Sequence, residues 1–171
     1  GLPSTFGGET LEVTFEDDEK GLRAVLLYTL FADTAALTRS VRLENIGGHT
    51  LTLERAFSFA FDLPAGAYEA LTLAGSWAAE CAPERTPLRH GIFTVNSKRV
   101  TSSATQNPFL AVMTAGADET HGDVYGVNLV YSSSYRLLAE TAQHGRVRVA
   151  GGINDFGFTW ELRPGDTFQT P

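Results

Sequence analysis

The sequence of 171 residues contains a single cysteine, Cys81, and therefore no pair that could form a disulfide within the chain. Disulfides accumulate in oxidising compartments, so their absence favours a cytoplasmic location. Long hydrophobic runs are missing as well, since no stretch approaches the roughly 18 apolar residues that a membrane-spanning helix needs. We therefore expect no membrane partner.

Basic residues are scarce. The chain has 13 Lys and Arg against 20 Asp and Glu, which gives a net charge of -7. Domains that bind nucleic acid concentrate Lys and Arg on one face, and the nearest approach here is the short RVRV segment at 146–149. We expect no nucleic-acid partner. With 43% hydrophobic and 19% charged residues, the composition is typical of one globular domain.

Helical spacing of apolar residues is missing, and the best helical candidate, TAALT after Asp33, is short. Alternation of apolar and polar residues, which is typical of half-buried strands, recurs instead. Its strongest example is 51–63, which predicts one long strand with Leu51, Leu53, Phe57, Phe59, Phe61 and Leu63 on its apolar face. Further strands are predicted at 11–15, 37–45, 68–73, 91–95, 124–131, 146–149 and 156–162, and strands covered on both faces at 24–31 and 109–113.

Polar turn signals separate these segments, as in DDEKG at 17–21, NIGGHT at 45–50 and RPGD at 163–166. The acidic run at 16–19 is expected at a solvated hairpin tip. Short strands separated by turns at this spacing predict an all-β fold, namely an antiparallel two-sheet sandwich.

The usual patterns for catalysis and metal binding are also missing. No G-x-S-x-G elbow and no phosphate-binding loop before a helix occurs, and Cys81 has no histidine near it in sequence. The acidic segment 118–123 lacks the calcium-loop pattern and is expected to be an ordinary turn. The histidines are expected to have loop or solvent-exposed roles; they are His49, His90, His121 and His144. We predict no catalytic residue, metal or cofactor, although a pair of carboxylates assembled by the fold stays open.

Trp77 follows closely on the alternating segment 68–73, and Glu80 comes three residues later. A tryptophan buries a large area but keeps an N–H that needs a partner. Trp77 could therefore stack on a sugar ring, or it could fill a core or an interface. We favour the core or interface role.

Residues 99–109, RVTSSATQNPF, are more polar than their surroundings and end in Asn107 and Pro108. Proline restricts the residue before it to extended geometry and lacks a hydrogen-bond donor. The segment predicts either a loop in which Ser102, Ser103 and Asn107 supply hydrogen bonds, or an irregular edge strand stopped by proline.

A series of motifs runs in one order along nearly the whole chain. The motifs are LTRSVRLENIG (37–47), LERAFSFAFDLP (53–64), G-x-W-x-x-E (75–80), RVTSSATQNPF (99–109), HGDVYGVNLVYSSSY (121–135), GINDFGFTW (152–160) and LRPGDTFQTP (162–171). In order and spacing, the series resembles the N-terminal β-domain of the bacterial and fungal α-galactosidases of glycoside hydrolase family 36.

The resemblance implies a galactose-mutarotase-like supersandwich, with residues 1–171 as a single β-sandwich domain. It implies a truncated part of a longer retaining α-galactosidase, which hydrolyses terminal α-D-galactosyl residues of sugars such as melibiose and raffinose. The family's two catalytic aspartates lie in a following TIM barrel, so this part is expected to be inactive alone. The chain starts without methionine, which also favours a fragment.

The partners implied are that barrel and the neighbouring subunits of a homo-oligomer. The candidates for contact with substrate or with an interface are Trp77, Glu80, Ser102, Ser103 and Asn107. The alternative is a stand-alone carbohydrate-binding module, with Trp77, Tyr125 or Tyr131 as stacking surface, or an assembly domain that binds a partner through an exposed apolar patch.

Two of the motifs depart from the family pattern. The family usually has R-G-x-S-S-H where this chain has Val100 and Ala104. It usually has Y-S-G-N-F where this chain has Ser133, Ser134 and Tyr135. Contacts made by these loops are therefore expected to differ from those of the family.

Overall fold

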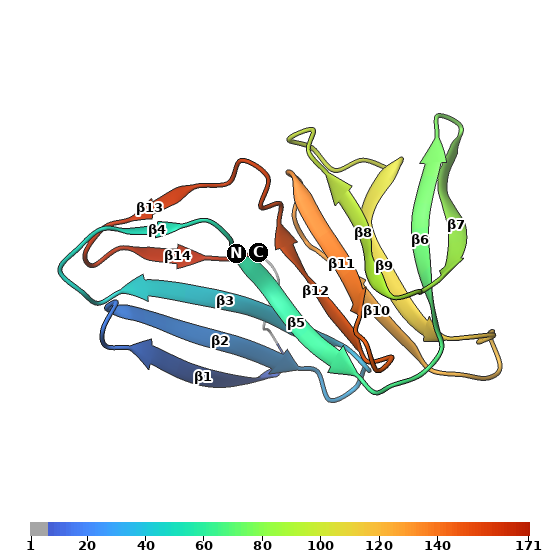
Figure 1. The fold of residues 1–171 in the computed structure, drawn as a ribbon, viewed down its shortest axis with the longest axis horizontal. Coiled ribbons are helices and arrows are strands. Elements are labelled where there is room, and N and C mark those ends of the chain that lie inside the picture. The colour runs from blue at the N-terminus through green and yellow to red at the C-terminus, as the bar shows by residue number, and fades with distance from the viewer. Residues whose placement is uncertain (1–6) are drawn as a thin grey trace. The chain divides into compact units, whose positions relative to one another are not determined.

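The computed structural model describes residues 7–171, in which fourteen β-strands are joined by turns and loops (Figure 1). The predicted all-β fold is confirmed, and the strands form antiparallel sheets. In this part of the chain, no helix is long and apolar enough to cross a membrane. Backbone contacts divide the chain into two compact units, the second being Ala60–Asn154 and the first comprising the residues on either side of it.

The first unit contains a four-stranded sheet in the order β1-β2-β3-β14 and a two-stranded sheet of β13 and β4. Phe168 of β14 packs against the rings of Phe158 and Trp160, with centroid distances of 6.0 and 5.2 Å. The bounds are β1 Glu9–Asp17, β2 Leu22–Leu30, β3 Leu37–Asn45, β4 Leu51–Leu53, β13 Trp160–Leu162 and β14 Thr167–Gln169.

The turn between β1 and β2 requires glycine at position 21. Gly21 adopts a φ of +66°, which favours glycine, and its N–H donates to the Asp17 carbonyl oxygen over 2.8 Å. A side chain at Gly21 would collide with the backbone of Gly47, whose N–H donates to the Gly21 carbonyl oxygen. The acidic residues before this turn lie at an exposed hairpin tip, as the sequence predicts.

The second unit consists of two four-stranded sheets. One has the order β10-β9-β6-β7 and the other the order β5-β12-β11-β8, with the division between the units falling within β5. Strand β9 also lies against β8 and β11, so the two sheets contact each other. The bounds are β5 Phe57–Leu63, β6 Tyr68–Ser76, β7 Ala79–Pro87, β8 Gly91–Ser97, β9 Gln106–Thr114, β10 Val124–Asn128, β11 Tyr135–Thr141 and β12 Val147–Ile153.

The core of the second unit lies where these sheets meet. Leu110 and Val112 of β9 are fully buried, and Ala111 and Met113 are buried as well, so the prediction of a strand covered on both faces is confirmed for 110–113, whereas Phe109 is half-buried. Leu137 of β11 and Val149 of β12 are equally inaccessible. Burial of such side chains supplies about 1.5–3 kcal/mol each.

The predicted single strand at 51–63 is wrong. It divides into β4 and β5, which pair in different sheets, with a bend at 54–56. Ala56 and Ser58, expected on the polar face, are 4% and 1% exposed. An alternation that only Arg55 interrupts therefore spans a break, because each half of the segment pairs with a different partner strand.

Sequence patterns also missed three strands, β7, β11 and β14. All nine residues of β7 are exposed, so no alternation marks it. Pro83 and Pro87 lie opposite Leu73 and Glu69 of β6, and neither proline has an N–H to donate. This edge strand therefore offers few donors to a further strand, which protects it from edge-to-edge pairing.

Candidate functional site

The candidate residues of the G-x-W-x-x-E and RVTSSATQNPF motifs come together at one end of the second unit. Ala74, near the end of β6, pairs with Gln106 at the start of β9. The N–H of Cys81 donates to the Ala104 carbonyl oxygen over 3.3 Å, and Asn107 Nδ2 lies 3.6 Å from Cys81 Sγ. The β6–β7 hairpin thus lies beside the loop that precedes β9 (Figure 1).

The tip of the β6–β7 hairpin has an unusual backbone. Gly75, Ala78 and Cys81 have positive φ angles of 147°, 63° and 56°. A side chain at Gly75 would collide with the Ala79 carbonyl oxygen, so glycine is required there. Glu80 Oε1 accepts a hydrogen bond of 2.9 Å from the Ala78 N–H, which gives Glu80 a local structural role.

Trp77 occupies this hairpin tip and is 91% exposed. The expectation that Trp77 fills a core is therefore wrong for this chain. Trp77 lies in the turn between β6 and β7, and β7 is an edge strand among the strands of residues 7–171. Contact with an interface or with a sugar stays a prediction.

Ser102 and Ser103 lie in the loop between β8 and β9. The Ser102 N–H donates to the Ser132 carbonyl oxygen over 3.2 Å, and Ser103 Oγ lies 2.8 Å from Thr105 Oγ1. The Val100 N–H donates to Ser134 Oγ over 2.9 Å. The loop is therefore held by the segment that leads into β11.

Asn107 and Pro108 belong to β9, an interior strand between β6 and β10. Neither predicted alternative is right for the whole of 99–109, because a loop covers its first half and a paired strand its second. Proline fits here because the register with β6 shifts between Thr72 and Ala74, which interrupts the ladder of hydrogen bonds.

Tyr135, at the start of β11, holds this end of β9 in place. Its hydroxyl donates a hydrogen bond of 2.9 Å to the Asn107 carbonyl oxygen, and the residue is fully buried. Burial raises the pKa of Tyr135 to about 12, so the phenol stays a neutral donor at physiological pH. Sequence reasoning noted Tyr135 only as a departure from the family motif and missed this contact.

Val100 is the other notable departure. It has a φ of 64°, in the left-handed region where a β-branched residue is a genuine outlier, and it is 72% exposed. The family pattern has glycine at this position, and glycine adopts that conformation without strain. The backbone of this loop thus keeps a glycine-like conformation although the residue is valine.

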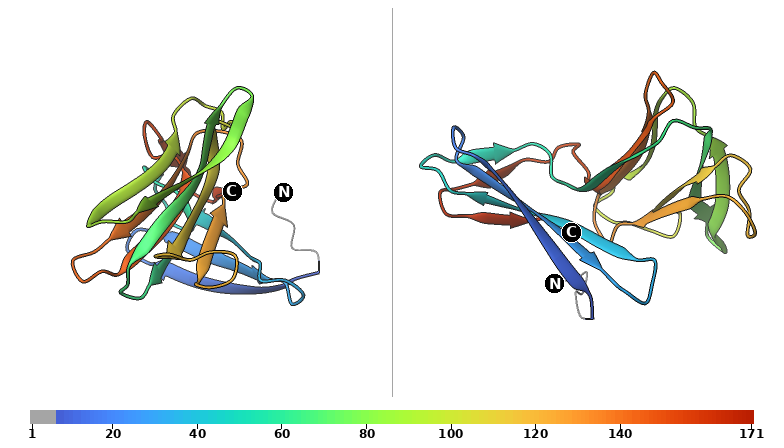
Figure 2. Two further views of the ribbon diagram at one scale, coloured as in Figure 1. Left: turned by 90° about the vertical axis from the view of Figure 1, so that its right-hand side faces the viewer. Right: turned by 90° about the horizontal axis from the view of Figure 1, so that it is seen from below.

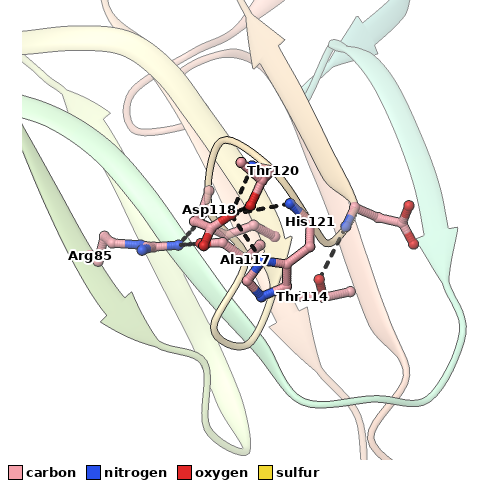
Figure 3. A network of polar contacts seen from close by, with 8 residues as sticks. Arg85, Thr114, Ala117, Asp118, Thr120 and His121 are labelled. Carbon is pink, nitrogen blue, oxygen red and sulfur yellow. Dashed lines mark hydrogen bonds and ion pairs between the residues drawn. The ribbon is translucent and has the colours of Figure 1, made fainter.

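A second polar network holds the loop between β9 and β10 (Figure 3). Asp118 Oδ1 accepts hydrogen bonds from the Thr120 N–H (2.7 Å), the Thr120 hydroxyl (2.8 Å) and the His121 N–H (3.1 Å). These bonds, led by the Thr120 backbone N–H, hold the pKa of Asp118 below its usual range. Hydrogen bonds within the segment therefore hold Asp118 in a compact turn.

Arg85 of β7 ties this loop to the sheet. Its guanidinium donates to the Ala117 carbonyl oxygen and lies 2.8 Å from Met113 Sδ, and Nε lies 3.5 Å from Glu69 Oε2. No local sequence pattern indicates this network, because Arg85 and Ala117 are 32 residues apart and meet only through the pairing of β6 with β7 and β9.

The candidate residues at this end of the second unit can bind a partner through hydrogen bonds and through the exposed ring of Trp77. Within residues 7–171, no group of three or more His, Cys, Asp or Glu side chains is arranged to hold a metal ion. Glu80 accepts from its own turn, and Ser102 and Ser103 bond to their own loop or to the segment before β11. The second unit therefore presents a polar end that carries the exposed Trp77.

Comparison with known proteins assigns this domain. The family model for the glycosyl hydrolase family 36 N-terminal domain matches residues 1–163. The chain belongs to this family. It is 44% identical over its whole length to alpha-galactosidase AgaA from Geobacillus stearothermophilus and 38% identical to alpha-galactosidase Mel36A from Lactobacillus acidophilus.

Solved structures agree with the assignment. A variant of AgaA from G. stearothermophilus in complex with raffinose superimposes with a TM-score of 0.93 over 96% of this chain. The galactosidase domain of an alpha-galactosidase–sucrose kinase, AgaSK, gives a TM-score of 0.92 at 35% identity. The chain spans 24% of the length of AgaA and 23% of the structure of the AgaA variant, so it corresponds to the N-terminal part of much longer proteins.

Proposed function

We propose that this chain is the non-catalytic N-terminal domain of a retaining α-galactosidase. The parent enzyme would hydrolyse terminal α-D-galactosyl residues of oligosaccharides such as melibiose and raffinose. The observation that carries this proposal is the match over the whole chain, at 44% and 38% identity, to two proteins named as alpha-galactosidases. The domain would support the catalytic barrel of the same polypeptide and the assembly of subunits.

The test is to express the whole gene that contains residues 1–171 and to assay an aryl α-galactoside. The expected result is release of the aryl alcohol by the long protein and none by residues 1–171 alone. A folded long protein with an intact barrel but without α-galactosidase or α-N-acetylgalactosaminidase activity would contradict the proposal.

We further propose that the end of the second unit that carries Trp77 and Glu80 meets a neighbouring subunit or lies near the substrate entrance. The support is the 91% exposure of Trp77, because an exposed tryptophan commonly anchors an interface. In the long protein, Trp77→Ala is expected to shift the subunit equilibrium or to raise KM. Unchanged light scattering and unchanged KM would argue against both roles.

The same exposure supports a second candidate, a carbohydrate-binding module. Tryptophan fluorescence of residues 1–171 would then change saturably with millimolar galactose or raffinose. Trp160 is 48% exposed and also emits, so the titration needs Trp77→Phe and Trp160→Phe as a matched pair. A signal that Trp77→Phe removes and Trp160→Phe keeps would favour the module.

We also propose a cytoplasmic location. Its support is the single cysteine, Cys81, which is free and exposed. Fractionation of the source cells with an antibody against this domain tests the proposal, and recovery of the protein from the medium or the periplasm would contradict it.

A further inference from the structure

One face of the sheet β1-β2-β3-β14 carries apolar side chains along most of β1, β2 and β3, with Glu9 and Arg39 among them. The register places Leu11 opposite Tyr28, Phe15 opposite Ala24, and Leu30 opposite both Glu9 and Leu37. Directly opposed residues project from the same face of a sheet, so these side chains share one face. We name this surface, exemplified by Leu11, Phe15, Leu30 and Leu37, the apolar face. Figure 2 shows its strands β1 to β3 side by side in blue and cyan.

The opposite face of the same sheet has a different chemistry. It carries ion pairs between Arg23 and Glu16 (2.6 Å), Arg23 and Glu44 (3.0 Å), and Arg42 and Glu44 (2.8 Å). Hydrogen bonds from Arg42 and Arg23 hold the pKa of Glu44 below its usual range. Charged networks of this kind are typical of a solvated surface. The two faces of the sheet therefore differ in chemistry, although the face with the ion pairs also holds Val25 and Thr29, each 2% exposed.

Part of the apolar face is open in residues 7–171, although Phe168 of β14 on the same face packs against Phe158 and Trp160. Leu11, Phe15, Leu30 and Leu37 are 62%, 58%, 57% and 56% exposed. A sheet normally buries its apolar face against another layer, and soluble proteins seldom leave a contiguous apolar patch of this kind to water. The open part of the apolar face is therefore a surface that another layer would normally cover.

The length of the related proteins indicates what that surface is. This chain corresponds to 24% of AgaA, at its N-terminal part, so about three quarters of such a protein lies outside it. Strand β14 borders the apolar face, and Thr170 both donates to and accepts from the backbone of Val41 in β3. In the longer proteins the polypeptide therefore continues from the margin of this sheet.

We propose that the apolar face is the docking surface for the polypeptide that follows residue 171 in the parent protein. Its occupant is a mainly apolar surface of the same chain. This inference rests on the proposal that the chain is part of a longer α-galactosidase. Strands β1, β2 and β3 would then form the surface through which the N-terminal domain contacts the rest of that protein.

Cysteine labelling of the long protein tests the inference. The variants are Leu11→Cys on the apolar face and Glu12→Cys, its neighbour on the opposite face of β1 and also exposed. The labelling rate of each is measured in native protein and in urea, and mass spectrometry of peptides counts each cysteine separately. We expect native protection of Leu11→Cys to exceed that of Glu12→Cys at least ten-fold. Equal protection would overturn the proposal.

Leu37→Cys and Thr38→Cys on β3 form a second pair, should the first variants not fold. Protection of the apolar face that disappears when an oligomer is diluted would assign the face to a second copy, and this also overturns the proposal. The labelling rates do not depend on catalytic activity. A long protein that protects the face but lacks galactosidase activity would therefore refute the proposed function and leave this inference standing.

Discussion

The backbone N–H of Val100 donates a 2.9 Å hydrogen bond to the side-chain oxygen of Ser134. The two residues belong to the two motifs in which this chain departs from the family pattern, and they are 34 residues apart. The departures are thus in direct contact, in the loops next to Ser102 and Ser103. The shape of this end of the domain depends on both motifs together.

Replacing Val100 with glycine should stabilise the protein. The residue has a φ of 64° and is largely exposed, so glycine would remove backbone strain and lose little packing. We expect the free energy of unfolding to rise by about 0.5–1 kcal/mol, after allowance for the greater freedom of glycine in the unfolded chain. Urea denaturation measures the change.

Val124→Gly is the matched control. Val124 lies in β10, is 53% exposed and has no positive φ, so the same substitution should destabilise by about 0.5–1 kcal/mol. Opposite signs for the two variants are the expected result, and a loss of stability in Val100→Gly would contradict the argument from strain.

Tyr135→Phe removes the hydrogen bond to the Asn107 carbonyl oxygen and leaves the ring in place. Because that oxygen is partly buried, we expect a loss of about 1 kcal/mol in the free energy of unfolding. Tyr68→Phe is a useful comparison, since the Tyr68 hydroxyl also donates to a backbone oxygen, that of Pro64, over 3.1 Å.

The ionisation of Tyr135 adds a pH dependence. Its pKa is raised to about 12 in the folded protein, above the ordinary value of 10.0, so the folded state holds the proton more tightly. The resulting stability is complete below about pH 10 and is lost as the pH rises toward 12. Tyr135→Phe should therefore weaken the alkaline fall in stability. An equally steep fall in wild type and variant would contradict this.

Ser58→Ala should be stabilising. Ser58 is 1% exposed, and its hydroxyl has no hydrogen-bond partner within residues 7–171. Removing an unsatisfied buried hydroxyl should raise the free energy of unfolding by about 1 kcal/mol. Chemical denaturation with a two-state fit provides the measurement.

Ser97→Ala is the control for Ser58. Ser97 is equally buried at 2%, but its hydroxyl donates to the Thr101 carbonyl oxygen over 2.8 Å. Its loss should cost about 1–3 kcal/mol, because a carbonyl oxygen is left unpaired. A destabilising Ser58→Ala with the same magnitude would show that Ser58 has a partner after all.

Asp118 should make the loop between β9 and β10 sensitive to acid. Its pKa is lowered by hydrogen bonds from Thr120 and His121, so its stabilising effect is present above about pH 4 and is lost as the pH falls through the folded value. Amide protection factors of Thr120 and His121, measured by hydrogen exchange, are expected to drop below pH 4.

Asp118→Asn separates charge from geometry. Asparagine keeps one oxygen that can accept the two backbone N–H groups, but it does not titrate. We expect the variant to retain part of the protection and to lose its dependence on acid. Protection in the wild type that stays constant from about pH 5 to pH 2 would exclude a role for the carboxylate.

Trp77→Ala should leave the stability of this chain unchanged within about 0.5 kcal/mol, as for other exposed positions. Thermal unfolding of residues 1–171 is the measurement. Leu110→Ala, at a fully buried position of β9, is the contrasting variant, with an expected loss of about 2–5 kcal/mol. A large loss in Trp77→Ala would mean that the ring packs within the domain.

Much of the fold was predictable from local pattern. The strands at Leu37–Asn45 and Gly91–Ser97 and the turn at 17–21 follow from alternation and from turn residues, which act over a few positions. The exposed edge strand β7 was not predictable, because it shows no alternation to read. Nor was the break at 54–56, because it depends on which strands β4 and β5 pair with.

By itself, the sequence determined the all-β class, most strands and turns, and the family through the order of its motifs. Only the tertiary structure decided that Trp77 is exposed, that Tyr135 holds the Asn107 backbone, and that Val100 adopts a glycine-like conformation. The reason is that periodicity records which face of a strand is apolar. Burial and hydrogen bonding depend on which distant segments lie against that face, and this is fixed only when the strands have paired.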